Sequence, residues 1–228
     1  MNIEHVTDTK KRNDGVIELT LTDPLTGETS RTPFLDIRGG ISWPTPKAPA
    51  YFCLIGQEYI EPPNTSRRKE HNEKGKQLLL TEYEIEQLSM DQFYSKLTSS
   101  AVVTGCRRFY ADLPDNRYEF GYLQDLNSYA KSKETEVYVA PAHDADEFIL
   151  GAARIKGTIN KGEISFPDNT IIHAQLSDLV VSDLEDKPEE KFHAINGVRH
   201  VLASYHRRPA ERKQLITRLP PPRNWRVM

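Results

Sequence analysis

Two short hydrophobic runs in this chain each end in an aspartate. The first is Phe34-Leu35-Asp36, shortly before Gly39-Gly40, and the second is Phe109-Tyr110-Ala111-Asp112, shortly before Pro114. A carboxylate at a strand end is held on rigid backbone, and two such carboxylates can share divalent cations. Aspartate is also favoured in turns beside Gly and Pro, which would explain either residue alone. The matched settings indicate two strands that carry their acids to a common site.

The hydrophobic patterns predict an α/β fold in which helices flank a mixed β-sheet. Strands are expected at 16–21, 34–36, 50–56, 109–112, 136–140 and 163–166. The strands on either side of Gly39-Gly40 should form an antiparallel hairpin with an enlarged loop. Capping boxes at Thr81/Glu84 and Ser89/Gln92 predict two helix starts. Further helices are expected over 118–131, 144–156 and 188–205.

The charges are unevenly spread, although the net charge is only −3. The last part of the chain is basic, with Arg207, Arg208, Arg212, Lys213, Arg218, Arg223 and Arg226 against Glu211. We predict a flexible N-terminal segment at 1–14, one domain at 15–208, and a basic C-terminal tail at 209–228. A basic region of this kind can contact polyanions.

Several classes of protein are disfavoured by what the sequence lacks. No apolar run approaches the ~20 residues of a membrane helix, and the start is too polar for a signal peptide. The two cysteines, Cys53 and Cys106, have neither zinc-site spacing nor a disulfide framework. The expected location is the cytoplasm (the host cytoplasm if the source is viral), with no membrane partner.

The order of these segments resembles the nuclease domain of phage large terminase subunits, within the ribonuclease-H-like nuclease superfamily. The residues that carry the resemblance are Phe34–Asp36, Phe109–Asp112, the stretch Ile155 to Leu176, and Phe192-His193-Ala194-Ile195-Asn196-Gly197-Val198-Arg199-His200. In that family the last helix usually reads Asp-His-Ala-Ile/Val-Asp-Ala-Leu-Arg-Tyr. This chain departs from the pattern at two positions. Asn196 stands where the family has its metal-binding aspartate, and Phe192 stands where the family has the aspartate that begins the pattern.

The resemblance implies a two-metal DNA endonuclease that uses two Mg²⁺ or Mn²⁺ ions. Asp36 would bridge both cations, Asp112 would bind one, and His193 or Asn196 would complete the weaker site. One cation would activate a water and the other would stabilise the leaving oxygen. Asn196 offers a neutral oxygen without charge, so it should weaken cation affinity.

Two readings of the C-terminal helix remain open from the sequence. His193, Asn196 and His200 share one helical stripe, which either lines a cleft or faces solvent. An acidic run at residues 143–147 could replace the missing acid or could simply begin a helix. The residues expected to contact double-stranded DNA are Arg67, Arg68, Lys69, Arg107, Arg108, Arg207 and Arg208.

The leading functional expectation is a nuclease that cuts concatemeric viral DNA for packaging. No Gly-x-x-x-x-Gly-Lys-Ser/Thr motif is present, so the packaging ATPase would be a separate partner, as would the portal. The alternatives are a catalytically degenerate ribonuclease-H-like DNA-binding or assembly module, and a nuclease resembling Holliday-junction resolvases. The Asn196 departure favours the degenerate module.

Overall fold

The structure is a computed structural model that describes residues 6–22, 26–61, 73–85, 90–112, 117–142, 147–167, 169–179 and 191–206. Its strands are β1 (Val6–Lys11), β2 (Ile17–Thr22), β3 (Thr29–Ser42), β4 (Ala50–Ile60), β5 (Glu73–Ile85), β6 (Arg108–Ala111), β7 (Tyr138–Pro141) and β8 (Ile164–Ser165). Its helices are α1 (Met90–Thr104), α2 (Arg117–Ser132), α3 (Phe148–Asn160), α4 (Ile171–Asp178) and α6 (His193–His206).

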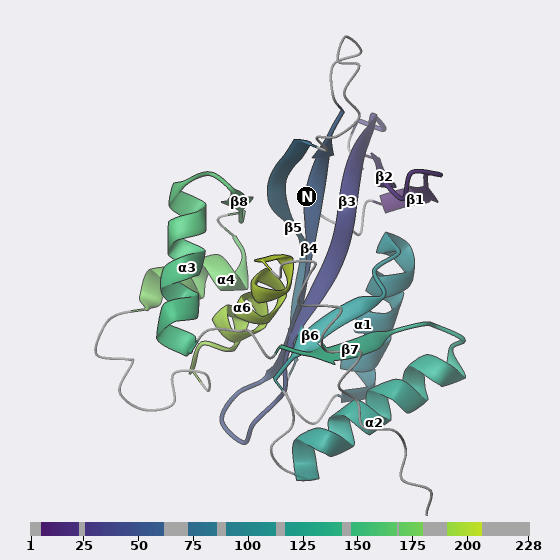
Figure 1. Cartoon of the computed structure of the whole chain (residues 1–228). Helices are drawn as coiled ribbons and strands as arrows, with labels where there is room; N and C mark the ends of the chain where they lie inside the picture. The colour runs from purple at the N-terminus through teal and green to yellow at the C-terminus, as the bar shows by residue number, and fades with distance from the viewer. Residues whose placement is uncertain are drawn as a thin grey trace, which may run out of the picture.

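The strands form one mixed eight-stranded sheet around the long strand β3 (Figure 1). One path runs β1-β2-β3-β4-β5-β8, and β6 and β7 continue from β3 off this path. The first half of β3 pairs antiparallel with β2, and its second half pairs in parallel with β6. The predicted fold class, a mixed β-sheet flanked by helices, is confirmed. The predicted antiparallel pairing is confirmed, as β3 with β4. Gly39 and Gly40 do not separate these strands, because both lie within β3. The strand end predicted at Asp36 is therefore wrong.

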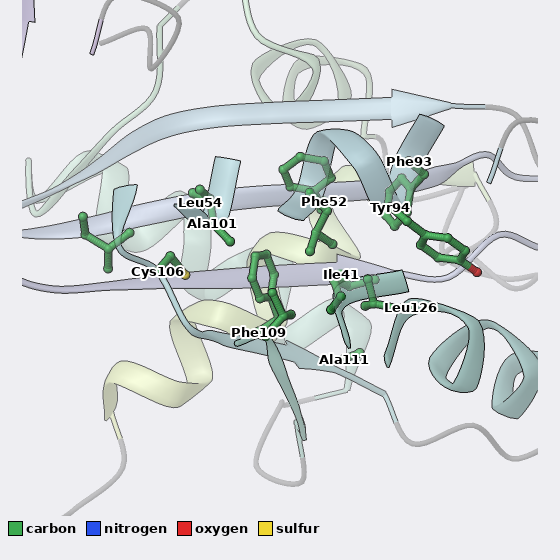
Figure 2. Packing of buried hydrophobic residues seen from close by; sticks show 14 of the residues in the cluster. Ile41, Phe52, Leu54, Phe93, Tyr94, Ala101, Cys106, Phe109, Ala111 and Leu126 are labelled. Carbon is green, nitrogen blue, oxygen red and sulfur yellow. The ribbon is translucent and has the colours of Figure 1, made fainter. Parts of the chain in front are cut away.

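Helices cover both faces of the sheet, and β4 shows why. Its residues from Ala50 to Gln57 are all buried, which a strand requires when both of its faces are covered. Phe52 and Leu54 pack with Phe93 of α1 and with Phe109 (Figure 2). The alternate residues from Tyr51 to Ile55 pack with α3, α4 and α6 on the opposite face. None of the described helices is both long and apolar enough to cross a membrane.

Two local predictions were wrong. The expected loose segment 1–14 contains strand β1, which pairs antiparallel with β2. The capping box at Thr81 does not start a helix, because β5 pairs with β4 as far as Ile85. Sheet pairing along the length of β4 outweighs a local signal that requires only four residues. The second capping box, at Ser89, precedes α1 as predicted.

Helix α6 lies unusually close to β3. A Cβ atom added to Gly40 would lie 2.0 Å from the carbonyl oxygen of Gly197, so no side chain fits at this crossing. A Cβ on Gly197 would lie 2.7 Å from the ring of Tyr51, which is fully buried. The two glycines therefore allow the helix backbone to contact the strand. This contact sets the position of every side chain on the sheet-facing side of α6.

Substitution of Gly197 by alanine should destabilise the protein by about 1–3 kcal/mol, because the added methyl group overpacks against Tyr51. Gly157 in α3 is the matched control, since a Cβ there meets no atom within 4 Å. Gly157→Ala should leave stability unchanged or raise it by up to ~1 kcal/mol through helix propensity. Urea denaturation of both variants measures the difference. Equal stability of the two variants would show that the α6–β3 contact is looser than described.

Candidate functional site

Asp112 follows the last residue of β6, beside the end of β3. The parallel register pairs Arg38 with Arg108 and Gly40 with Tyr110. Continued by two residues, this register places Ser42 opposite Asp112. The strand-end position predicted for Asp112 is correct, and half of its side-chain surface, 51%, is exposed. Ser42 is therefore the β3 residue that accompanies Asp112 at this edge.

Three side chains of α6 meet at this edge. The Asn196 amide nitrogen donates to Ser42 Oγ at 3.2 Å, which joins the helix to the end of β3. Arg199 Nε donates to Asn196 Oδ1 at 3.0 Å. Arg199 Nη2 donates to Asp112 Oδ2 at 3.2 Å, and His200 Nε2 lies 3.0 Å from the same oxygen. Ser42, Asp112, Asn196, Arg199 and His200 are called the Asp112 cluster below.

The stripe on α6 faces the protein interior. His193, Asn196 and His200 are all buried, with Asn196 only 7% exposed, so the solvent-facing alternative is wrong. The cause is the close crossing at Gly197, which turns this face of α6 toward β3 and β4.

Arg199 reaches Asp112 through a gap left by another glycine. A Cβ on Gly151 of α3 would lie 2.6 Å from Cδ of Arg199, so the arginine stem occupies the space of a missing side chain. Only 8% of the Arg199 side chain is exposed. An arginine buried along its stem, with its planar end on a carboxylate and an amide oxygen, is held in one geometry.

The Asp112 carboxylate is compensated by the protein's own cationic groups. Burial alone would raise its pKa, but the hydrogen bond and charge of His200 and the charge of Arg199 together lower the Asp112 pKa below its ordinary value. His200 Nδ1 lies 2.9 Å from the carbonyl oxygen of Ile41. His200 thus contacts both the end of β3 and Asp112.

The donor set of this cluster does not fit a pair of divalent cations. Such cations are held by several convergent carboxylates, and among the described residues of this cluster Asp112 is the single carboxylate. The oxygen of Asn196 is bonded to Arg199, and Asp112 Oδ2 contacts both Arg199 and His200. Among the described residues, no group of three His, Cys, Asp or Glu side chains is placed to hold a metal ion.

Asp36 does not meet Asp112, and the prediction that the two acids converge is wrong. In the register of β3 with β6, Arg38 pairs with Arg108. Asp36 lies two residues before Arg38, whereas Asp112 lies four residues after Arg108. This offset of six residues separates them by about 20 Å along the strands. Asp36 instead accepts a hydrogen bond from Arg38 Nε at 2.7 Å. The guanidinium of Arg38 in turn lies over the ring of Tyr205, 4.4 Å from its centroid.

His193 is also separate from Asp112. Its Nε2 lies 2.7 Å from Oε2 of Glu84 on β5, and its ring meets Tyr51 edge-on. Gln175 of α4 contacts the same imidazole and accepts from the backbone N–H of Ala194 at 2.9 Å. Since β3 and β4 lie between β5 and β6, His193 contributes to the start of α6 rather than to the Asp112 cluster.

The predicted DNA contacts are only partly described. Arg107 and Arg108 are exposed at the start of β6, and Arg107 pairs with Glu136 at 2.7 Å. Arg67, Arg68 and Lys69, the pair Arg207 and Arg208, and most of the acidic run at 143–147 lie outside the described residues. Their roles stay predictions.

The sequence indicated Asp112 and Asn196 but not their partners. Arg199 lies one helical turn after Asn196, so a helical wheel could have placed the two side chains together. Ser42 carried no signal, because the offset between β3 and β6 decides which β3 residue meets Asp112.

No protein-family model matches the sequence, and no curated protein is significantly similar to it. Two solved structures resemble the fold. One is the large terminase nuclease from thermophilic phage G20c, solved with bound zinc, with a TM-score of 0.44 and 8% sequence identity. The alignment covers 86% of this chain and 94% of the terminase nuclease chain. The fowlpox virus Holliday junction resolvase has a TM-score of 0.38 and 11% identity, covering 74% and 96%. At these TM-scores, neither structure defines the chemistry of the Asp112 cluster.

The lowered pKa of Asp112 predicts a specific acid dependence of stability. A carboxylate whose folded-state pKa lies below its unfolded-state pKa stabilises the fold fully at pH values above the unfolded-state pKa. This contribution is lost as the pH falls through the folded-state pKa. The wild type should therefore lose more stability than Asp112→Asn between about pH 5 and about pH 2. Urea denaturation across this range measures the difference. Parallel curves would mean that Arg199 and His200 do not stabilise the ionised carboxylate.

Proposed function

We propose that this chain is a nucleic-acid-binding module whose Asp112 cluster is neutralised by its own cations and does not cleave DNA. The observation that carries the proposal is the contact of Arg199 and His200 with one carboxylate oxygen of Asp112. In a two-metal nuclease, a carboxylate at such a position would contact cations from solution. Here a guanidinium and an imidazole make those contacts.

Electrostatics explains why a divalent cation would bind poorly in this cluster. A metal ion beside Asp112 would approach Arg199, which is buried and permanently charged. Like charges a few ångströms apart repel each other strongly when one of them, here Arg199, is shielded from solvent. Asn196 provides no compensating charge, and its oxygen already accepts from Arg199. Metal binding would therefore require Arg199 to leave a site that Gly151 has shaped around it.

The chain's basic segments support contact with nucleic acid. Residues 207–228, which follow α6 directly, carry seven Arg and Lys residues against one Glu. Cations arranged along a chain bind a phosphate backbone without reading its sequence. The partner of this module is then double-stranded DNA. A separate packaging ATPase and a portal are partners of the same assembly, in keeping with the terminase resemblance.

A metal-dependent endonuclease is the competing function. The observation in its favour is that half of the Asp112 side chain is exposed, which leaves the carboxylate within reach of solvent. Cleavage of supercoiled plasmid with Mg²⁺ or Mn²⁺ separates the two functions, with Asp112→Asn as the matched control. The wild type should show no more nicking than the control. Nicking that Asp112→Asn abolishes would establish the endonuclease instead.

Binding to duplex DNA should be electrostatic and independent of divalent cations. Fluorescence anisotropy in the presence of EDTA should give a logarithm of affinity that falls linearly with the logarithm of salt concentration. Asp112→Asn should bind with unchanged affinity, because the cluster provides no phosphate contact. An affinity that requires Mn²⁺ would contradict this prediction, as would the absence of any binding at low salt.

Variants of Asn196 and Arg199 test whether Arg199 keeps metal ions away from Asp112. Asn196→Asp alone should bind no more Mn²⁺ than the wild type, since the new carboxylate would pair with Arg199. Arg199→Met alone retains an apolar stem in the gap at Gly151, but Asp112 is then the only carboxylate of the cluster, so Mn²⁺ should still bind weakly. The double variant Asn196→Asp/Arg199→Met has two carboxylates that Arg199 no longer contacts. It should bind Mn²⁺ at least about tenfold more tightly than either single variant.

Isothermal titration calorimetry with Mn²⁺ measures all four proteins, and thermal unfolding confirms that each is folded. Wild-type binding as tight as that of the double variant would show that Arg199 does not exclude the metal.

A further inference from the structure

A cleft opens on the sheet at the point where β3 changes partners. The pairing of β2 with β3 ends at Phe34, and the pairing of β6 with β3 begins at Arg38. Between these points, residues 35–37 have no partner on this side among the described strands. The divergence of β2 and β6 leaves a cavity of about 540 Å³. This cleft lies at the opposite end of β6 from Asp112.

The cleft is lined by apolar and basic residues from separate elements. Its apolar lining includes Ile17, Ile37 and Val102. Lys11 reaches it from β1, and Arg107 and Arg108 reach it from the start of β6. Lys11 follows Thr9 on the cleft side of β1, whereas Lys10 between them is not part of the lining. Two segments almost a hundred residues apart thus bring their cations to one cavity.

The charges around the cleft do not cancel. Asp36, the acid in the lining, is paired with Arg38 at 2.7 Å. Arg107 is paired with Glu136 at 2.7 Å. Within the described ranges, neither Lys11 nor Arg108 has an ion-pair partner. The cleft therefore carries an excess of two positive charges beside an apolar wall.

We propose that this cleft binds a phosphate group. A phosphate with a free terminal oxygen carries −1.5 to −2 charge near neutral pH, about the excess that Lys11 and Arg108 supply. Arginine binds phosphate oxygens with two parallel N–H groups, and lysine binds them as a point charge. No aromatic side chain lines the described part of the cleft, so it has no platform for stacking a base. The site recognises the phosphate rather than a nucleobase.

The site is independent of whether the Asp112 cluster binds metal or DNA. The phosphate has two possible sources, a nucleic-acid strand or a small phosphorylated compound, and the ligand chemistry is the same for both. Gly15 and Gly105 line the cleft, and their backbone amides therefore report on its occupancy.

The test is a titration of the ¹⁵N-labelled full chain with inorganic phosphate in EDTA, followed by NMR. The amide resonances of Gly15 and Gly105 should shift to saturation. Lys11→Gln and Arg108→Gln should each weaken binding by about tenfold, the effect of one charge-assisted hydrogen bond. Lys10→Gln, on the neighbouring residue of β1, should bind as the wild type does. Thermal unfolding verifies that the variants are folded.

Competition by short oligothymidine identifies the source of the phosphate. Tighter competition by a 5′-phosphorylated strand than by its 5′-hydroxyl form assigns the site to strand ends, and equal competition assigns it to the backbone. If neither strand displaces phosphate, the ligand is a small phosphorylated compound. Phosphate binding without duplex binding would remove the proposed function but keep this site. Absence of saturable shifts, or equal affinities for Lys11→Gln and Lys10→Gln, would overturn the proposal.

Discussion

The contact between Gly40 of β3 and Gly197 of α6 determines the rest of the site. A side chain at either position would push the helix away from the sheet, because the nearest atoms are a backbone carbonyl and the buried ring of Tyr51. At this short distance, the sheet-facing residues of α6 reach the ends of β3 and β6. The hydrogen bond from Asn196 to Ser42 and the ion pair from Arg199 to Asp112 both depend on this position of the helix.

In the Asp112 cluster, side chains of the chain itself contact the carboxylate. Arg199 and His200 provide charge-assisted contacts, and their positions are fixed by backbone elements rather than by a ligand. Gly151 on α3 leaves room for the arginine stem, so three elements define one interaction. The charge of Arg199 is present at all times, whereas a metal ion must bind from solution. The cluster is therefore suited to holding α6 against the sheet.

The strands and the layers could be predicted from the sequence, but the meeting of residues across the sheet could not. The apolar run of β4 and the acid at the end of β6 were evident from local patterns. Asp36 resembled Asp112 in its local setting, yet the register of β3 with β6 places Ser42 there instead. Register depends on pairing between distant strands, which a local pattern does not contain. The same limitation explains Thr81, where β5 pairs with β4 despite a capping box.

We propose that Arg199 and His200 occupy the place of divalent cations beside Asp112. Crystals grown in excess Mn²⁺ test it directly, because anomalous scattering locates the metal without assumptions about activity. We expect the Arg199 guanidinium to remain on Oδ2 of Asp112, with no manganese coordinated by that carboxylate. Manganese bound to Asp112, with Arg199 displaced from it, would contradict the claim.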